Sequence, residues 1–332
     1  MKHQRLLFKL FILFGLSANV ASAQEKEKKR YEFFKERNFS HSYSLNGNEH
    51  LFLSNQFGKI EIKTWPKNEV KVDVHIVTSS TVKEANDERF DNIEIKHKKE
   101  ANTVSFVTEL NSSRKKEYSG SQSNTIDIDY VVYMPANTSL IVKNKHGKTI
   151  IPSLNNRVSI TQEFGELTVG RLSQSSSIEV KFSKAAFESL HNADLNIQFA
   201  RSPITINNAT GKLDIETKHC KDGITVYADQ LTDLDIDAEF SNIGVVLSND
   251  ASAYFKIDTD FGSFTNQSSF TIKDQSDDND RRYGPRFAYT YKGTSGNGKS
   301  KIILAGKHSD FIISNSAPDF SKKQRKRNTT VI

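Results

Sequence analysis

The feature that most constrains the fold is an aromatic residue followed by a small one, repeated along the chain. Successive copies lie 18, 18, 17, 20, 21 and 21 residues apart, so the period is near 20. The pairs are His146-Gly147, Phe164-Gly165, Phe182-Ser183, Phe199-Ala200, His219-Cys220, Phe240-Ser241 and Phe261-Gly262. A fixed period of this length is typical of architectures built from stacked units.

An aliphatic residue lies four positions before each of these aromatic residues, and the offset never varies. Apolar and acidic residues alternate over Leu234–Phe240, which indicates a β-strand because its alternate side chains point to opposite faces. A second short strand follows each pair, as at Ile204–Ile206. A unit this short cannot bury its apolar face alone, so neighbouring units must stack.

We therefore predict an all-β fold: a single-chain β-solenoid over roughly residues 137–270, with aliphatic and aromatic ladders both pointing inward. The predicted aromatic ladder consists of Phe164, Phe182, Phe199, His219, Phe240 and Phe261. Aromatic rings that face outward would instead be platforms for sugar stacking. The histidines His146 and His219 are expected to pack in place of Phe, because no zinc-type ligand spacing surrounds them.

The regions on either side of the repeats have sequence patterns that indicate further β-strands without the short repeat. Residues 40–136 are predicted to be a β-rich N-terminal cap with one helix at Val82–Phe90 and one early copy of the signature at Phe57-Gly58. Such a cap would cover the first open rung of a solenoid. Residues 271–315 are predicted to hold terminal strands and a flexible loop.

The first residues resemble a secretory signal. Basic residues precede the apolar run Leu10–Leu16, and Ala21-Ser22-Ala23 matches a cleavage site, so residues 1–23 are predicted to be a signal peptide. A retained N-terminal anchor is the alternative. The only cysteine, Cys220, is far from this site, which excludes a lipid-modified cysteine there. We expect an exported protein, in the periplasm or on the cell surface, with no transmembrane span after cleavage, and a charged linker at 24–39.

The excess positive charge lies at the two ends of the chain. Without residues 1–23 the sequence holds 43 basic and 40 acidic residues, and five of the basic ones lie in the last eleven positions. These are Lys322, Lys323, Arg325, Lys326 and Arg327. The tail at 316–332 is predicted to be a solvated, disordered end or a weak contact for an anionic surface. Because the rest is near neutral, no nucleic-acid partner is predicted.

A polar residue follows each core aliphatic by one position and should point outward. This predicted outward strip contains Glu179, Asn196, Glu216, Asp237 and Asp258. Three interpretations are open: a solvated acidic surface, a calcium site, or the acid and base of a polysaccharide-cleaving enzyme. No convergent catalytic set, metal site or cofactor is predicted.

The segment Gly293–Ser300 matches the phosphate-binding pattern GxxxxGK[ST]. That site requires a helix after the loop, whereas Lys301–Leu304 reads as a strand. A hairpin loop rich in Gly, Ser and Asn is the preferred interpretation.

The chain resembles a family of exported bacterial β-strand-repeat proteins that carry the name "putative adhesins". The resemblance rests on the aromatic-Gly repeats, on Tyr130–Pro135 before the first rung and on the closing strand Lys301–Leu304. It implies a surface or periplasmic protein and supplies no catalytic residues. We therefore expect a non-enzymatic envelope scaffold that binds an envelope protein or a glycan.

Overall fold

The computed structural model describes residues 31–111, 123–276 and 287–320. Within these ranges the chain is built from strands and a single helix, α2 (Lys83–Asp91), so the predicted all-β class and the predicted helix are confirmed. The predicted signal peptide and the five basic tail residues lie outside the described residues. The predicted linker at 24–39 is partly wrong, because strand β1 (Phe33–Ser44) already begins at Phe33.

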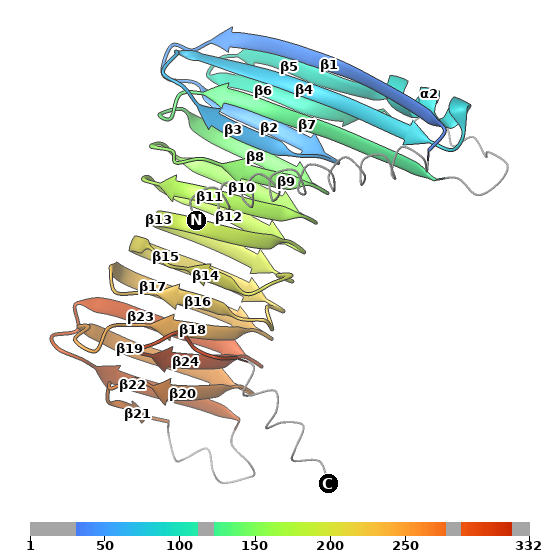
Figure 1. The fold of residues 1–332 in the computed structure, drawn as a ribbon. Helices are drawn as coiled ribbons and strands as arrows, with labels where there is room; N and C mark the ends of the chain where they lie inside the picture. The colour runs from blue at the N-terminus through green and yellow to red at the C-terminus, as the bar shows by residue number, and fades with distance from the viewer. Residues whose placement is uncertain (1–30, 112–122, 277–286, 321–332) are drawn as a thin grey trace, which may run out of the picture.

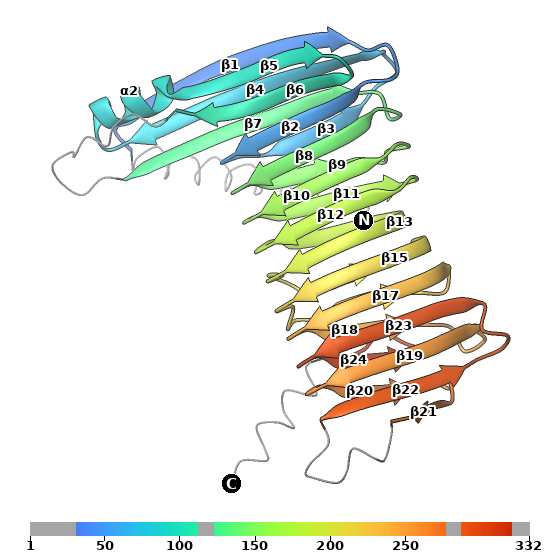
Figure 2. The same cartoon turned by 180° about the vertical axis from the view of Figure 1, so that it is seen from behind.

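Most strands belong to two parallel ladders that run the length of the molecule (Figures 1 and 2). In spatial order the first ladder is β2 (His50–Gln56), β8 (Ser139–Lys145), β10 (Val158–Glu163), β12 (Ser176–Lys181), β13 (Lys184–Gln198), β15 (Ala209–Lys218), β17 (Leu231–Glu239), β23 (Ser300–Lys307) and β19 (Ala253–Asp260).

The second ladder lies against the first across the core. Its order is β3 (Ile60–Thr64), β9 (Lys148–Ile151), β11 (Glu166–Leu172), the first half of β13, β14 (Ile204–Ile206), β16 (Ile224–Tyr227), β18 (Asn242–Val246), β24 (Asp310–Ser314) and β20 (Ser263–Gln267). We use "rung" for one strand of each ladder joined by an aromatic-small pair. The parallel pairing thus extends beyond residues 137–270 on both sides.

The core lies between the two ladders and consists of the alternate, inward side chains of every rung. Ile160, Ile178, Leu195, Ile215 and Ile236 are paired in register and almost fully buried. Each stacked strand adds one buried aliphatic layer, which supplies the apolar burial that a single rung could not provide.

The last rung in the sequence is not the last rung in space. Strand β23 pairs with β17 on one side and with β19 on the other, and β24 lies between β18 and β20 in the same way. The sequence-based expectation that the Phe261 rung follows the Phe240 rung directly is therefore wrong. A period alone cannot show that a later segment has been inserted between two earlier ones.

The N-terminal strands close one end of the stack. Strand β7 (Asn124–Met134) continues the second ladder from β3 by parallel pairing, and β4 (Glu69–Ser80) and then β1 follow by antiparallel pairing. Strands β6 (Thr103–Leu110) and β5 (Ile93–Glu100) continue the first ladder from β2. Helix α2 packs against β4 and β1.

Charged side chains join the two edge strands of this cap. Arg37 of β1 donates a hydrogen bond to the carbonyl of Ile93, and Lys99 of β5 donates one to the carbonyl of Ser44 over 2.8 Å. Both side chains lie on the inward side of their strands. The inward positions of β1 are therefore not all apolar. This explains why the sequence Phe33–Asn38 reads as a charged linker rather than as a strand.

The other end carries short antiparallel strands and a folded-back segment. Strand β22 (Ala288–Thr294) pairs with β19 and with β21 (Ile272–Asp274). After β24 the chain crosses the outer side of the second ladder, where a side chain added at Gly244 would lie 2.4 Å from Pro318. Phe320 packs equally closely over Gly223. We call residues 315–320 the C-terminal strap.

Candidate binding surfaces

The aromatic residue of every rung adopts a left-handed backbone conformation. The nine residues from Phe57 to His308 that begin these turns have φ between 50° and 60°, although none is glycine. Strand alternation would point a residue four positions after a core aliphatic into the core. The left-handed turn points it outward instead. The prediction of an inward aromatic ladder at Phe164, Phe182, Phe199, His219, Phe240 and Phe261 is therefore wrong.

The rings outside the core form one continuous stack, which we call the aromatic column. Its order is Phe57, His146, Phe164, Phe182, Phe199, His219, Phe240, His308, Phe261 and Phe287. The centroids of neighbouring rings lie 4.6–5.2 Å apart. Most planes are within 16° of parallel, and the separations indicate offset stacking.

Stacking and backbone strain are of similar size in this column. A left-handed conformation costs a residue other than glycine about 1–2 kcal/mol, and a favourable aromatic pair contributes about 0.5–1.5 kcal/mol. Because each interior ring contacts two others, the column offsets much of the strain at its turns. The ring pairs that contain histidine have the same stacked geometry, so His146, His219 and His308 take the place of Phe in the column.

Two of the glycine turns are held by a polar side chain from the inner side of the strand, which sequence reasoning missed. Two residues before the aromatic, Asn144 donates to the carbonyl of Gly58 over 3.2 Å and Gln162 donates to the carbonyl of Gly147 over 2.9 Å. Both side chains are buried. The available signal was a polar residue at an inward strand position.

Where serine replaces glycine in the turn, the serine hydroxyl makes the equivalent connection. Ser183 Oγ accepts from the backbone N–H of Gly165 over 3.0 Å, and Ser241 Oγ accepts from that of Cys220 over 3.1 Å. The inward residue two positions before the aromatic is then apolar or small, as at Val180 and Ala238. The rungs with these residues therefore satisfy polar groups of their turns from one side or the other.

The residues of the predicted outward strip lie in one row on the outer side of the first ladder. Strand register places Glu179, Asn196, Glu216 and Asp237 side by side on successive strands. Asp258 is not the next member, because Ala305 of the inserted strand β23 lies between Asp237 and Asp258. The strip is thus interrupted where the sequence analysis expected it to continue.

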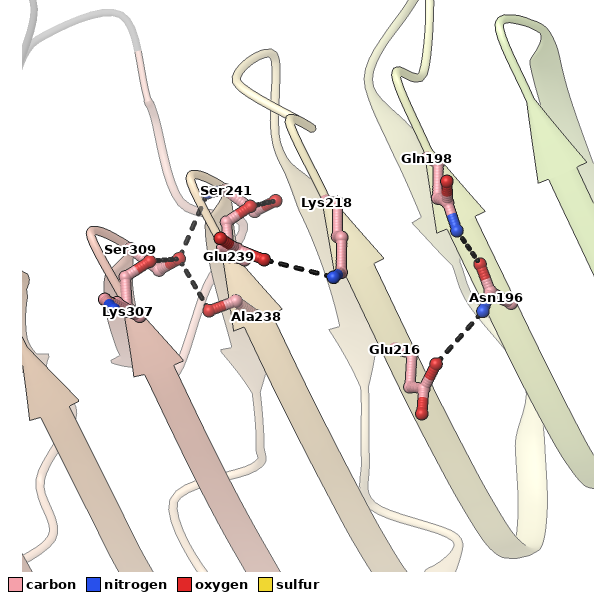
Figure 3. A network of polar contacts seen from close by, with 9 residues as sticks. All are labelled: Asn196, Gln198, Glu216, Lys218, Ala238, Glu239, Ser241, Lys307 and Ser309. Atoms are coloured by element: carbon pink, nitrogen blue, oxygen red, sulfur yellow. Dashed lines mark hydrogen bonds and ion pairs between the residues drawn. The ribbon is translucent and has the colours of Figure 1, made fainter.

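Several members of the strip are held by neighbouring side chains (Figure 3). Gln198 donates to Asn196, and Asn196 donates to Glu216 over 3.0 Å. Glu179 is paired with Lys181. In the adjacent row Lys218 forms an ion pair of 3.1 Å with Glu239. Alternation of amide, lysine and carboxylate reduces the repulsion between acidic groups on strands about 4.8 Å apart.

The interruption at Ala305 leaves a hollow of about 680 Å³ on the outer surface. Asp237 and Asp258 flank it, and the small residues Ala305 and Gly306 contribute to its lining. The rest of the lining comes from β19, β22, β23 and the two residues after β21, and it includes Lys256, Asp260, Gln275, Ser276, Thr290, Lys292 and Lys307. The hollow combines both charges, hydroxyls and an amide, so it can donate and accept several hydrogen bonds.

The two carboxylates beside the hollow differ in their surroundings. Asp258 accepts from Thr290 over 2.7 Å and pairs with Lys256 over 2.8 Å. Partial burial alone would raise the pKa of Asp258, but these hydrogen bonds outweigh it and lower the pKa below the ordinary value. Asp258 is therefore ionised at neutral pH. Asp237 is exposed, and no described residue forms an ion pair with it.

The loop that matches the phosphate-binding pattern is wrapped around a serine of its own chain. The backbone N–H groups of Asn297 and Lys299 donate to Ser252 Oγ over 3.1 and 3.2 Å. The loop joins strands β22 and β23, which pair with opposite edges of β19, so the expected hairpin is wrong although the strand after the loop is present. Its amide groups are thus used within the fold, and no helix follows to form a phosphate site.

Two kinds of feature are absent from the described ranges. Among them no group of three or more His, Cys, Asp or Glu side chains is placed to hold a metal ion. No helix in residues 31–111, 123–276 or 287–320 is long and apolar enough to cross a membrane.

Comparison with known proteins finds low similarity in sequence. No protein-family model matches the chain, and no curated protein matches it. One similar crystal structure is of a "putative cell adhesion protein" from Clostridium sporogenes, at 13% identity and a TM-score of 0.22, covering 84% of this chain and 99% of that one. Another is of a "putative adhesin" from Bacteroides fragilis, at 12% identity and a TM-score of 0.36, covering 84% and 97%.

Proposed function

We propose that this chain is an exported, non-enzymatic β-solenoid scaffold of the cell envelope or cell surface that binds a protein or glycan partner. Its N-terminal segment would direct export, and its stacked rungs would present the outward strip. The resemblance of the repeats to adhesin-like exported proteins supports the same role. Fold alone does not specify a function, so the proposal depends on the surface of the first ladder.

The hollow at Ala305 is the observation that carries the proposal. Every other member of its row from Glu179 to Asp258 has a polar side chain, so this is the position where the strip opens into a concavity. A concave, polar site with an unpaired carboxylate at Asp237 is suited to bind hydroxyl or ammonium groups of a partner.

A polysaccharide-cleaving enzyme is the second candidate, because Asp237 and Asp258 face the hollow from both sides. Such an enzyme needs one carboxyl group that is protonated near neutral pH. The lowered pKa of Asp258 makes it unsuited to that role. In such an enzyme Asp258 could serve only as the ionised carboxylate, and Asp237 would have to supply the acid.

The test compares two substitutions in the hollow with one outside it. Ala305→Leu fills the concavity and Asp237→Asn removes its unpaired charge, whereas Ser177→Ala changes an exposed position elsewhere on the first ladder. We expect the first two variants to lose a partner captured saturably from envelope extract, and Ser177→Ala to retain it. Cleavage products from a panel of polysaccharides that vanish with Asp237→Asn would establish the enzyme instead.

Location is tested separately from binding. Fractionation should place the chain in the envelope after loss of residues 1–23. Protease added to intact cells distinguishes surface display from the periplasm, and protection until the envelope is opened would contradict adhesion at the surface. Recovery of the chain from the cytoplasm with residues 1–23 intact would contradict export.

A further inference from the structure

The C-terminal part of the aromatic column is exposed, unlike most of its N-terminal part. Phe199, Phe240, Phe261 and Phe287 are exposed by 39%, 37%, 51% and 49%. The rings of His219 and His308 lie between them in the stack and are exposed as well. We call these six residues the ring ridge. Contiguous exposed apolar surface on a soluble fold marks an interaction site.

The ridge presents the edges of its rings. Each interior ring is covered on both faces by its neighbours, so a sugar or base cannot stack there as it would on an isolated ring. The edge of an aromatic ring carries the positive part of its quadrupole. The histidine edges also bear N–H groups, and no described residue accepts a hydrogen bond from the ring of His219 or His308. The ridge therefore favours an anionic partner with oxygen acceptors.

Cations flank the ridge at regular positions. Lys184, Arg201 and Lys221 each lie two residues after a ring of the column, and Lys307 directly precedes His308. All four are exposed, and none forms an ion pair with a described residue. Three acidic residues also lie beside the ridge: Asp222 and Asp260, which have no ion pair with a described residue, and Asp310, two residues after His308, which accepts from Ser263 over 2.5 Å. The flanks therefore have a net positive charge.

The described chain ends beside the same turns. Phe320 packs over Gly223, which follows the His219-Cys220 turn by three residues. The sequence that continues from Phe320 contains Lys322, Lys323, Arg325, Lys326 and Arg327. The contribution of this basic sequence is therefore tested separately from that of the ridge.

We propose that the ring ridge and its flanking cations bind an acidic polysaccharide that lies along the stack. Rungs repeat about every 4.8 Å, so the positive groups form a linear array, which suits a polymer with one carboxylate on each sugar. The surface meets the hollow at Lys307 and Asp260, but its test varies Lys184, Arg201 and Lys221, which do not line the hollow.

The experiment measures binding of the protein to polygalacturonate, with neutral dextran as the comparison. We expect polygalacturonate to bind, dextran not to bind, and added salt to weaken the complex. Lys184→Glu, Arg201→Glu and Lys221→Glu together should weaken binding roughly tenfold or more. The control reverses three exposed lysines of the cap, Lys63, Lys67 and Lys98, the first and last of which are ion-paired, and it should bind as the parent does.

Two further variants separate the ridge from general charge attraction. Phe261→Asn removes a ring while keeping a residue that tolerates the left-handed turn, and should weaken binding with an unchanged melting temperature or a small decrease. Replacing the five basic tail residues with Gln should leave most of the binding. Equal loss in the cap control, complete loss in the tail variant, or equal affinity for a DNA duplex would each overturn the proposal.

Discussion

The backbone N–H of Ser241 donates a hydrogen bond of 3.1 Å to the hydroxyl of Ser309, which lies 68 positions later in the chain. Ser309 is buried and in turn donates to the carbonyl of Ala238 over 2.9 Å. One side chain thus connects the inserted C-terminal rung to the rung before it.

Substitution of Ser309 by alanine should destabilise the fold. The change leaves the buried N–H of Ser241 and the carbonyl of Ala238 without this partner, at a cost of about 1–3 kcal/mol. Urea unfolding should show a lower midpoint for Ser309→Ala. The exposed Ser177→Ala is the control, expected within about 0.5 kcal/mol of the parent. Equal midpoints for the two variants would contradict a structural role for Ser309.

At the left-handed turns we expect the usual stability ranking of alanine and glycine variants to be inverted. Glycine in a strand is normally less stable than alanine by about 0.5–1 kcal/mol. At Phe182, where φ is 50°, Phe182→Gly should instead be more stable than Phe182→Ala, because glycine adopts this conformation without strain. The control is Phe187, a buried residue of β13 with ordinary backbone, where alanine should be the more stable. The same ranking at both positions would refute this interpretation.

The ion pair between Lys99 and Glu49 in the N-terminal cap predicts that the free energy of unfolding depends on pH. Lys99 lies 2.8 Å from Glu49, whose side chain is 4% exposed, and its hydrogen bond lowers the pKa of Glu49 from 4.5 to about 2. Since the folded pKa is the lower one, the stabilisation is complete above pH 4.5 and is lost as the pH falls towards 2.

Glu49→Gln should therefore lower the stability at pH 7 and lose most of this difference near pH 2. Chemical unfolding at a series of pH values measures the effect. Glu109→Gln, at an exposed position of β6, serves as the control and should follow the parent at every pH. A Glu49→Gln difference that stays constant between pH 7 and pH 2 would rule out the linkage.

The C-terminal strap predicts a specific effect at Gly244. A Cβ atom there would lie 2.4 Å from Pro318, so Gly244→Ala must displace the strap. We expect faster protease cleavage within residues 315–320 and faster hydrogen exchange around Ile312, which is buried beside Gly244 in register. Thr205→Ala, at an exposed position of β14, is the control and should leave both rates unchanged.

Much of the fold could be predicted because apolar and polar residues alternate along the strands. The aliphatic residues at positions such as Ile160 and Ile236 identify the inward face of each strand, and their constant offset from the aromatic pair fixes the units. The direction of the rings could not be read from the same alternation. It depends on a φ angle that sequence spacing does not report, and Phe in that conformation is uncommon.

The candidate surface was predictable in part. The strip from Glu179 to Asp237 follows from register alone, but the hollow exists only because Ala305 enters the row from a distant segment. The pair His308-Ser309 carries the same signature as the other turns, with Leu304 four residues before it, so this rung could have been found from the sequence. Its place between two earlier rungs could not, because no local interaction encodes the spatial order of stacked strands.

The position of β23 and β24 also has a consequence for synthesis. While the chain emerges from the ribosome, β17 and β19 are complete before the strand that must lie between them has been made. The native arrangement of this end therefore forms only after residues 300–314 are available, and any earlier pairing of β17 with β19 must open again. Synthesis through residue 314 is thus a condition for the last folding step.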